Sequence, residues 1–259
     1  MTPGIASVVL GGLAILAGLG FWSPVEAAPV QVRFAEGVTH GLLRLQSLGG
    51  DTVGHGDLLQ TARGEQVTSR LVLRLKDGSL HDETVVFSQR RVFTMLRYQL
   101  VQRGPSFPVA LEATLDGSTG RYTVRSAKNG REETESGRIE LPPDVYNGMV
   151  PMLLKNLPHG AGETIHLVAF TPKPRLIQLE LTPVGRQQVL AAGVARQATR
   201  FALKPRLGSA LSLVATLLGK TPSDAECVIL TDDVPGFVRY DGSLHPTGPT
   251  LRTELVAAR

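Results

Sequence analysis

Hydrophobic and polar residues alternate with a period of two along much of the chain. Leu71, Leu73 and Leu75 fall on one face of such a segment, while Arg74 and Lys76 fall on the opposite face. This alternation is typical of a β-strand with one buried and one solvated face. The same reasoning predicts further strands at 83–87, 91–101, 109–115, 122–125, 137–141, 164–170, 176–181, 195–203, 226–230, 237–240 and 251–256.

Tight-turn dipeptides separate several of these predicted strands. Asp77-Gly78, Asp116-Gly117 and Asn129-Gly130 each stand between two extended segments. Asn-Gly and Asp-Gly favour the two-residue turns that join antiparallel strands, because both residues tolerate positive φ. The sequence therefore predicts a meander of antiparallel strands.

The two-residue rhythm breaks once, near the middle of the chain. Pro142 and Pro143 end a strand and can open a helix, and apolar residues then recur at helical spacing. These are Val145, Met149, Met152, Leu153 and Leu157. We expect a short helix within 143–157, packed on the concave face of a large curved antiparallel sheet with the shape of a half-barrel or open barrel. Residues 28–259 would form this single, mainly β domain.

The N-terminal segment has the features of an export signal. An apolar stretch covers residues 5–22, Pro24 interrupts it, and Val25 and Ala27 are suited to the positions before a signal-peptidase cut. We expect residues 1–27 to be a signal peptide cleaved after Ala27, which would place the protein in the periplasm or outside the cell. The alternative is an uncleaved membrane anchor, because about 18 apolar residues can just cross a bilayer.

Composition narrows the classes of protein that fit. Charged residues are 19% and hydrophobic residues 42% of the 259-residue chain, which excludes an intrinsically disordered protein. A single cysteine, Cys227, excludes a disulfide scaffold and a cysteine-built zinc site. Because Cys227 lies in an apolar run, we expect it to be buried in the core rather than reactive.

No segment carries a recognisable catalytic motif. The chain has neither a Gly-x-Ser-x-Gly nucleophile turn nor a glycine-rich dinucleotide motif. The densest polar cluster joins His55 and Asp57 to His81 and Glu83, which are residue types that bind metals or transfer protons. Each half of the cluster has only one histidine, which is fewer than zinc sites usually have, and its glycines and aspartates are typical of a turn. We therefore expect no metal ion, and we expect no catalytic residues and no cofactor in the chain. A hydrolase of the cell envelope that uses these four residues is the alternative.

Basic residues outnumber acidic ones, 27 to 23, for a formal net charge of +4. Several fall on one face of two predicted strands, namely Arg70, Arg74 and Lys76 on the first and Arg91, Arg97 and Arg103 on the second. Such a face could meet an anionic membrane or cell-wall polymer, or could simply be solvated. We do not expect a nucleic-acid partner, because the chain has an export signal and no aromatic stacking motif.

Four segments of the chain resemble a group of uncharacterised secreted bacterial proteins that carry a domain of unknown function. They are 75–84, 101–108, 141–148 and 171–176. The resemblance covers most of the chain after residue 27. More distantly, the order of strands, helix and further strands is similar to periplasmic half-barrel proteins of the lipoprotein-carrier type. This resemblance implies a curved antiparallel sheet and brings no catalytic motif with it.

A curved sheet covered by a helix leaves an apolar groove, and such grooves bind ligands. We therefore expect a non-enzymatic protein that binds a lipid or another amphipathic molecule there. The groove walls would be Leu71, Leu73, Leu75, Val85, Phe87, Met149 and Leu153, with Arg91 and Arg97 engaging an anionic head. The same apolar residues are equally compatible with an ordinary core, in which case the protein would be a structural or interaction module without a ligand.

Overall fold

A single antiparallel sheet dominates the computed structural model, which describes residues 29–170, 174–191, 193–206, 224–231 and 234–256. Within these residues fourteen strands pair in the order β8-β7-β6-β5-β4-β3-β2-β1-β14-β13-β12-β11-β10-β9. The first half comprises β1 (Thr39–Ser47), β2 (Thr52–Arg63), β3 (Gln66–Leu75), β4 (Leu80–Ser88), β5 (Thr94–Arg103), β6 (Ala110–Asp116), β7 (Arg121–Lys128) and β8 (Arg131–Arg138). The helix α1 (Val150–Asn156) precedes β9 (Glu163–Ala169), β10 (Arg175–Ala191), β11 (Val194–Arg206), β12 (Ala225–Leu230), β13 (Gly236–Ser243) and β14 (Thr250–Leu255). The predicted fold class is confirmed.

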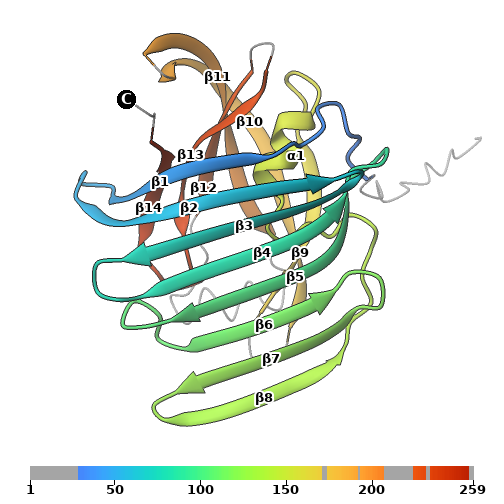
Figure 1. Ribbon diagram of the computed structural model, residues 1–259, viewed down its shortest axis with the longest axis vertical. Helices are drawn as coiled ribbons and strands as arrows, with labels where there is room; N and C mark the ends of the chain where they lie inside the picture. The colour runs from blue at the N-terminus through green and yellow to red at the C-terminus, as the bar shows by residue number, and fades with distance from the viewer. Residues whose placement is uncertain (1–28, 171–173, 192, 207–223, 232–233, 257–259) are drawn as a thin grey trace, which may run out of the picture.

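The sheet curls over on itself without closing. In Figure 1, β1–β8 run across the page at the front, while β9–β13 run up the page behind them. The pairing of β1 with β14 joins the two halves, and the terminal strands β8 and β9 do not pair with each other. Gly54 and Gly56 of β2 are buried, and a β-carbon on either would overlap the backbone of β3. Glycine at these two positions lets the neighbouring strands approach closely where the sheet bends.

The predicted hairpin turns are present. Gly78 has a φ of 85° between β3 and β4, and Asp116-Gly117 begins the turn between β6 and β7. Asn129 and Gly130 join β7 to β8 with φ values of 52° and 76°. Two successive positive φ values define the turn whose twist matches that of paired strands. The sequence therefore specifies these connections locally.

The helix α1 lies between the two halves of the sheet and packs against β12 and β13. Met152, Leu153 and Leu154 are buried in the main hydrophobic core, with Leu153 fully enclosed. The predicted location on the concave face is thus correct, but the helix is shorter than the expected 143–157. Residues 144–147 run beside β9 instead, where Tyr146 N–H donates to the His166 carbonyl at 3.0 Å.

Both ends of the open sheet are protected against further pairing. On β9, the Asn147 side chain accepts a hydrogen bond from Val168 N–H and donates to the Val168 carbonyl, both at 2.8 Å. On β8, every residue is polar or glycine, and the strand is almost wholly exposed. Covering an edge or placing charges on it prevents edge-to-edge association. This all-polar composition also explains why alternation predicted the strand too late, at 137–141, instead of Arg131–Arg138.

The sequence pattern did not predict the first two strands, β1 and β2. The glycine-rich segment that contains His55 and Asp57 is part of the long strand β2, which pairs with β1 on one side and β3 on the other. The predicted signal peptide, residues 1–27, lies outside the described residues. Among the described residues, no helix combines the length and apolar character that a membrane crossing requires.

Candidate functional site: a cavity between sheet and helix

A cavity of about 350 Å³ lies between the concave face of the sheet and α1. Its wall is mainly apolar, and strands from both halves of the sheet contribute to it. The apolar wall residues are Leu43, Leu58, Leu71, Leu73, Val85, Leu100, Val150, Pro151, Met152, Leu167, Phe237 and Leu244. A volume of this size falls at the lower end of the range of small-molecule sites, about 300–1,000 Å³.

Strand register explains which side chains reach the cavity. Alternate residues on each strand face inward, and pairing aligns them in rows across the sheet. One row contains Leu73, His81 and Gln102, because Leu73 pairs with His81 and His81 pairs with Gln102. The next row, two residues further along each strand, contains Leu71, Glu83 and Leu100. Polar side chains therefore stand within an otherwise apolar surface.

Glu83 is the acidic side chain that faces the cavity. Its carboxyl group accepts a hydrogen bond from the Tyr98 hydroxyl at 2.6 Å, and this hydroxyl is its one hydrogen-bond partner among the described residues. Tyr98 stacks on Phe170 from the opposite half of the sheet, with ring centroids 5.5 Å apart. Burial, followed by the negative charge of Glu83, raises the pKa of Tyr98 well above its ordinary value. Tyr98 therefore stays protonated and donates to Glu83.

His81 and Gln102 form a second polar pair in the wall. The Gln102 amide donates to His81 Nδ1 at 3.0 Å and to the Leu244 carbonyl at 2.7 Å. Burial lowers the pKa of His81 despite the nearby carboxylates, so the ring is neutral at pH 7. Because Nδ1 accepts a hydrogen bond, the proton of the neutral ring is on Nε2. His81 therefore contributes a donor to the site and no charge.

Lys155 of α1 is a positively charged side chain in the cavity wall, and it forms an ion pair with Glu36. Its ammonium group lies 2.5 Å from Glu36 Oε1, and both side chains are largely buried. The Gln60 amide donates to the other oxygen of Glu36 at 2.8 Å. Removing either partner would leave a buried charge uncompensated, so this pair is held in place.

The residues that the sequence proposed as groove walls fall into two groups. Leu71, Leu73 and Val85 line the cavity. Phe87, Met149 and Leu153 are fully buried in the main core and do not line it. The last residue of the set, Leu75, packs on a smaller cluster formed by Leu43, Leu45, Leu73 and Leu251.

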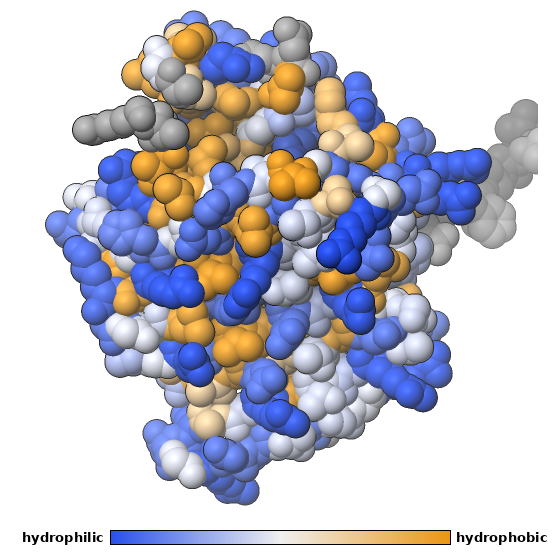
Figure 2. All heavy atoms as spheres, viewed as in Figure 1, coloured by the Kyte–Doolittle hydropathy of each residue, from blue (hydrophilic) through white to orange (hydrophobic). Residues whose placement is uncertain are grey.

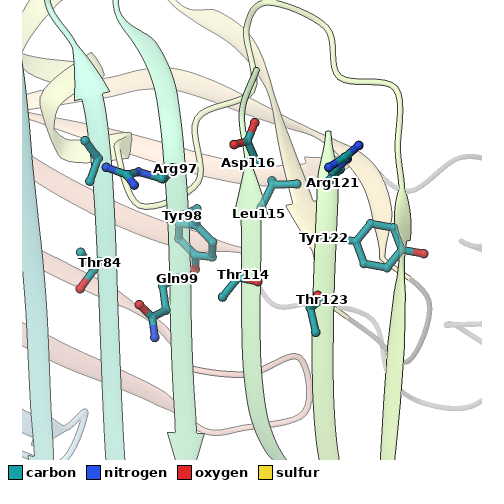
Figure 3. Close-up of a pocket in the computed structure, with 11 residues that line it drawn as sticks. Thr84, Arg97, Tyr98, Gln99, Thr114, Leu115, Asp116, Arg121, Tyr122 and Thr123 are labelled. Atoms are coloured by element: carbon teal, nitrogen blue, oxygen red, sulfur yellow. The ribbon is translucent and has the colours of Figure 1, made fainter. Parts of the chain in front are cut away.

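The two arginines expected to hold an anionic head lie away from the cavity. Figure 3 shows Arg97 on the outer face of β5, beside a shallow depression of about 450 Å³ that Gln99, Asp116 and Arg121 also border. Arg91 is exposed and precedes β5. Neither arginine therefore faces the wall residues named above, because side chains that alternate along a strand are divided between two faces.

The rest of the predicted basic face is partly neutralised. Arg70 binds Asp82 through two hydrogen bonds of 2.9 and 2.6 Å on the outer face. Arg74 lies 3.8 Å from Asp57.

In the depression that Arg97 borders, Ser118 and Thr119 donate hydrogen bonds to the Asp116 carboxylate, which lower its pKa to about 2. Asp116 therefore remains ionised near neutral pH and does not serve as a proton donor.

The four residues of the hydrolase alternative do not converge. His55 and Asp57 are on the outer face of β2, where Asp57 lies 3.1 Å from His40, whereas His81 and Glu83 face the interior from β4. Among the described residues no group of three or more histidine, cysteine, aspartate or glutamate side chains is arranged to hold a metal ion. Cys227 is buried, as predicted, and burial raises the pKa of its thiol.

Several wall residues were missed by the sequence reading. Gln60, Ser69, Tyr98 and Gln102 are polar residues that occupy inward positions, where alternation leads one to expect apolar side chains. The sequence signal that could have identified them is a polar residue at a strand position where the two-residue period calls for an apolar one. Tyr240 reaches the cavity from β13, and burial raises its pKa to about 12.

Comparison with protein-family models and with curated proteins gives no match. Among solved structures, the chain is similar to a β-barrel-like protein from Brucella abortus. That protein is described as a domain of unknown function, DUF1849. The two chains are 11% identical, the match covers 86% of this chain and 98% of the other, and the TM-score is 0.48. Since the description gives that protein no function, nothing about binding or catalysis passes to this chain.

Proposed function

We propose that this protein is an exported, non-enzymatic component of the bacterial cell envelope that binds an apolar or amphipathic small molecule between its curled sheet and α1. The observation that carries the proposal is the mainly apolar cavity of about 350 Å³ beside the main hydrophobic core. Native interiors contain few voids larger than a water molecule, so a cavity of this size requires an explanation.

Binding would draw its energy from the burial of apolar ligand surface. Each Å² of apolar surface removed from water contributes roughly 25 cal/mol. The polar groups of the wall would fix the orientation of the ligand, as a few polar groups do in most small-molecule sites. The export part of the proposal rests on residues 1–27, whose apolar stretch and small residue at position 27 are typical of a signal peptide.

The test is uptake of a neutral apolar probe by the purified protein. We expect N-phenyl-1-naphthylamine to gain fluorescence on mixing with the protein, and decanol to displace it in a saturable manner. A neutral competitor is used so that the result depends on the cavity and not on charge. If neither molecule binds, the protein is a structural or interaction module and the proposal fails.

A further inference from the structure

Among the described residues, five titratable side chains line the cavity, namely His81, Glu83, Tyr98, Lys155 and Tyr240. The two tyrosines stay protonated near neutral pH because burial raises their pKa values, so the charge of the wall depends on the other three. His81 is neutral, Lys155 is paired with Glu36, and Glu83 is left with the neutral Tyr98 hydroxyl as its hydrogen-bond partner. An anionic head placed here would be repelled by Glu83 and would have to break the contact between Lys155 and Glu36. Burying a charge without a compensating partner is costly, so the wall disfavours anions.

Aromatic rings accompany the Glu83 carboxyl group. Tyr98 donates to it, and Tyr240 lines the same cavity. Phe237 also lines the cavity. Ammonium groups form strong, charge-assisted hydrogen bonds with carboxylates, and Glu83 is the carboxylate of this wall that has no cationic partner among the described residues.

We propose that the ligand carries an ammonium group on a single apolar chain, with the ammonium bound by Glu83 and the chain buried against the leucine-rich wall. This inference rests on the proposed function and specifies its ligand class. Leu71 and Leu100 flank Glu83 in the same row of the sheet, and Leu58 pairs with Leu71 from β2. The ammonium site is thus surrounded by the apolar surface that would bury the chain.

The experiment compares decylamine, decanol and decanoate, which share a chain and differ in head group, as competitors of the same fluorescent probe. We expect decylamine to bind the wild-type protein about tenfold or more tightly than decanol, and decanoate to bind most weakly. Glu83→Gln keeps an acceptor for Tyr98 and removes the charge, so it should abolish the preference for the amine. Glu112→Gln, a half-exposed glutamate on β6, is the matched control and should leave the preference unchanged.

The outcomes separate this inference from the proposed function. If decanol binds as tightly as decylamine, or if decanoate binds best, the ammonium site is overturned while the apolar cavity stands. A preference that survives Glu83→Gln also overturns it. If none of the three competitors binds, the proposed function itself fails. The wild-type series can overturn the ammonium site by itself, so the proposal stays falsifiable even if Glu83→Gln does not fold.

A second observation, independent of the cavity, concerns the β10–β11 hairpin. β9 pairs with β10 over Arg175–Leu181 only, and β12 pairs with β11 over Ala198–Leu203 only. Beyond these limits, apart from a backbone hydrogen bond from Thr231 to Gln197, the described residues show β10 and β11 paired with each other alone as far as Ala191 and Val194. The hairpin therefore projects beyond the sheet as a two-stranded ribbon, seen at the upper end of Figure 1.

The end of this ribbon is apolar, exposed and basic. Leu190 and Val194 are 78% and 59% exposed, and in Figure 2 apolar residues gather at the same upper end of the molecule. The sequence from Leu181 to Arg206 contains no aspartate or glutamate, whereas the exposed Arg186 lies on the same ribbon as the apolar end. Exposed apolar side chains beside a basic residue are suited to an anionic bilayer, whose surface attracts the arginine while its interior accepts the apolar groups.

We further propose that this ribbon end docks on an anionic lipid bilayer. In vesicle co-sedimentation, the chain that begins after Ala27 should bind vesicles of phosphatidylglycerol and phosphatidylcholine, and should bind vesicles of phosphatidylcholine alone about tenfold less well. The double substitution Leu190→Ser and Val194→Ser should lower binding by a similar factor. Leu48→Ser, at the exposed β1–β2 turn, is the control and should bind like the wild type.

Three results would overturn the docking proposal. The first is equal binding to both kinds of vesicle, the second is binding that the double substitution leaves unchanged, and the third concerns the oligomeric state. If light scattering shows a dimer that the double substitution converts to a monomer, the ribbon end is an interface between two copies of the chain, and membrane docking is wrong.

Discussion

Replacing Leu153 with alanine should lower the free energy of unfolding by about 2–5 kcal/mol, the usual cost of emptying a fully buried leucine site. Leu153 is the fully enclosed residue of α1, and the helix fills the space between the two halves of the sheet. The helix has only seven residues, so its stability comes from packing and not from its own hydrogen bonds. The substitution should therefore loosen both halves of the sheet together, and not only the helix.

Urea unfolding followed by far-ultraviolet circular dichroism measures this effect. The wild-type protein and the Leu153→Ala variant should share one slope and differ in midpoint. Leu42→Ala removes the same atoms from a side chain that is 56% exposed on β1, and should change the free energy of unfolding by less than about 0.5 kcal/mol. If the two variants lose equal stability, α1 does not serve as the core of this fold.

Filling the cavity should abolish binding of the neutral probe while the protein stays folded. Leu71→Trp places a larger side chain in the row that contains Glu83 and Leu100. Its additional ring atoms would occupy the space that the apolar ligand needs, so we expect probe affinity to fall by about tenfold or more. In the chain that begins after Ala27, which lacks Trp22, the new indole is the one tryptophan and reports its surroundings, so a blue-shifted emission would show that it is buried.

Leu59→Trp is the matched control, since Leu59 is 47% exposed on the outer face of β2. This variant should bind the probe like the wild type and emit at longer wavelength. Circular dichroism of both variants should match that of the wild type, because the indole at position 71 enters space that is already open. Undiminished probe binding by a folded Leu71→Trp variant would place the binding site elsewhere.

Much of the fold follows from local sequence signals. The two-residue period predicted strands such as β7, and turn dipeptides such as Asn129-Gly130 predicted how successive strands connect. Two strands were mispredicted because the period is absent: β8 has no apolar residue, and in β2 glycines replace the inward side chains at positions 54 and 56. There the strand is specified by its neighbours and not by its own composition, which a local pattern cannot reveal. β1 was also not predicted, although its buried residues Leu43 and Leu45 do alternate with exposed ones.

The candidate site was predictable in part. Alternation correctly placed Leu71, Leu73 and Val85 on one inner face, but it could not separate them from Phe87, which lies on the same face and is packed in the core. That difference depends on how far α1 and the opposite half of the sheet extend along each strand. A cavity is what remains after side chains from distant segments have packed together, so no local pattern specifies it.

The position of Arg97 shows a second limit of the sequence reading. The pairing of β4 with β5 shifts register between Val86 and Phe87, so that one residue of β5 is inserted opposite this point. Such a bulge changes which residues of a strand face inward. Counting in twos from Arg91 therefore gives no reliable indication of the face on which Arg97 lies.

Native mass spectrometry of the protein mixed with decylamine or decanol tests the central claim most directly, because it counts bound molecules. We predict a single adduct on the wild-type protein, with the mass of one ligand, and its loss from the Leu71→Trp variant but not from Leu59→Trp. A protein that retains its folded charge-state distribution and carries neither ligand, or an adduct that persists equally in Leu71→Trp, would contradict a ligand site between the sheet and α1.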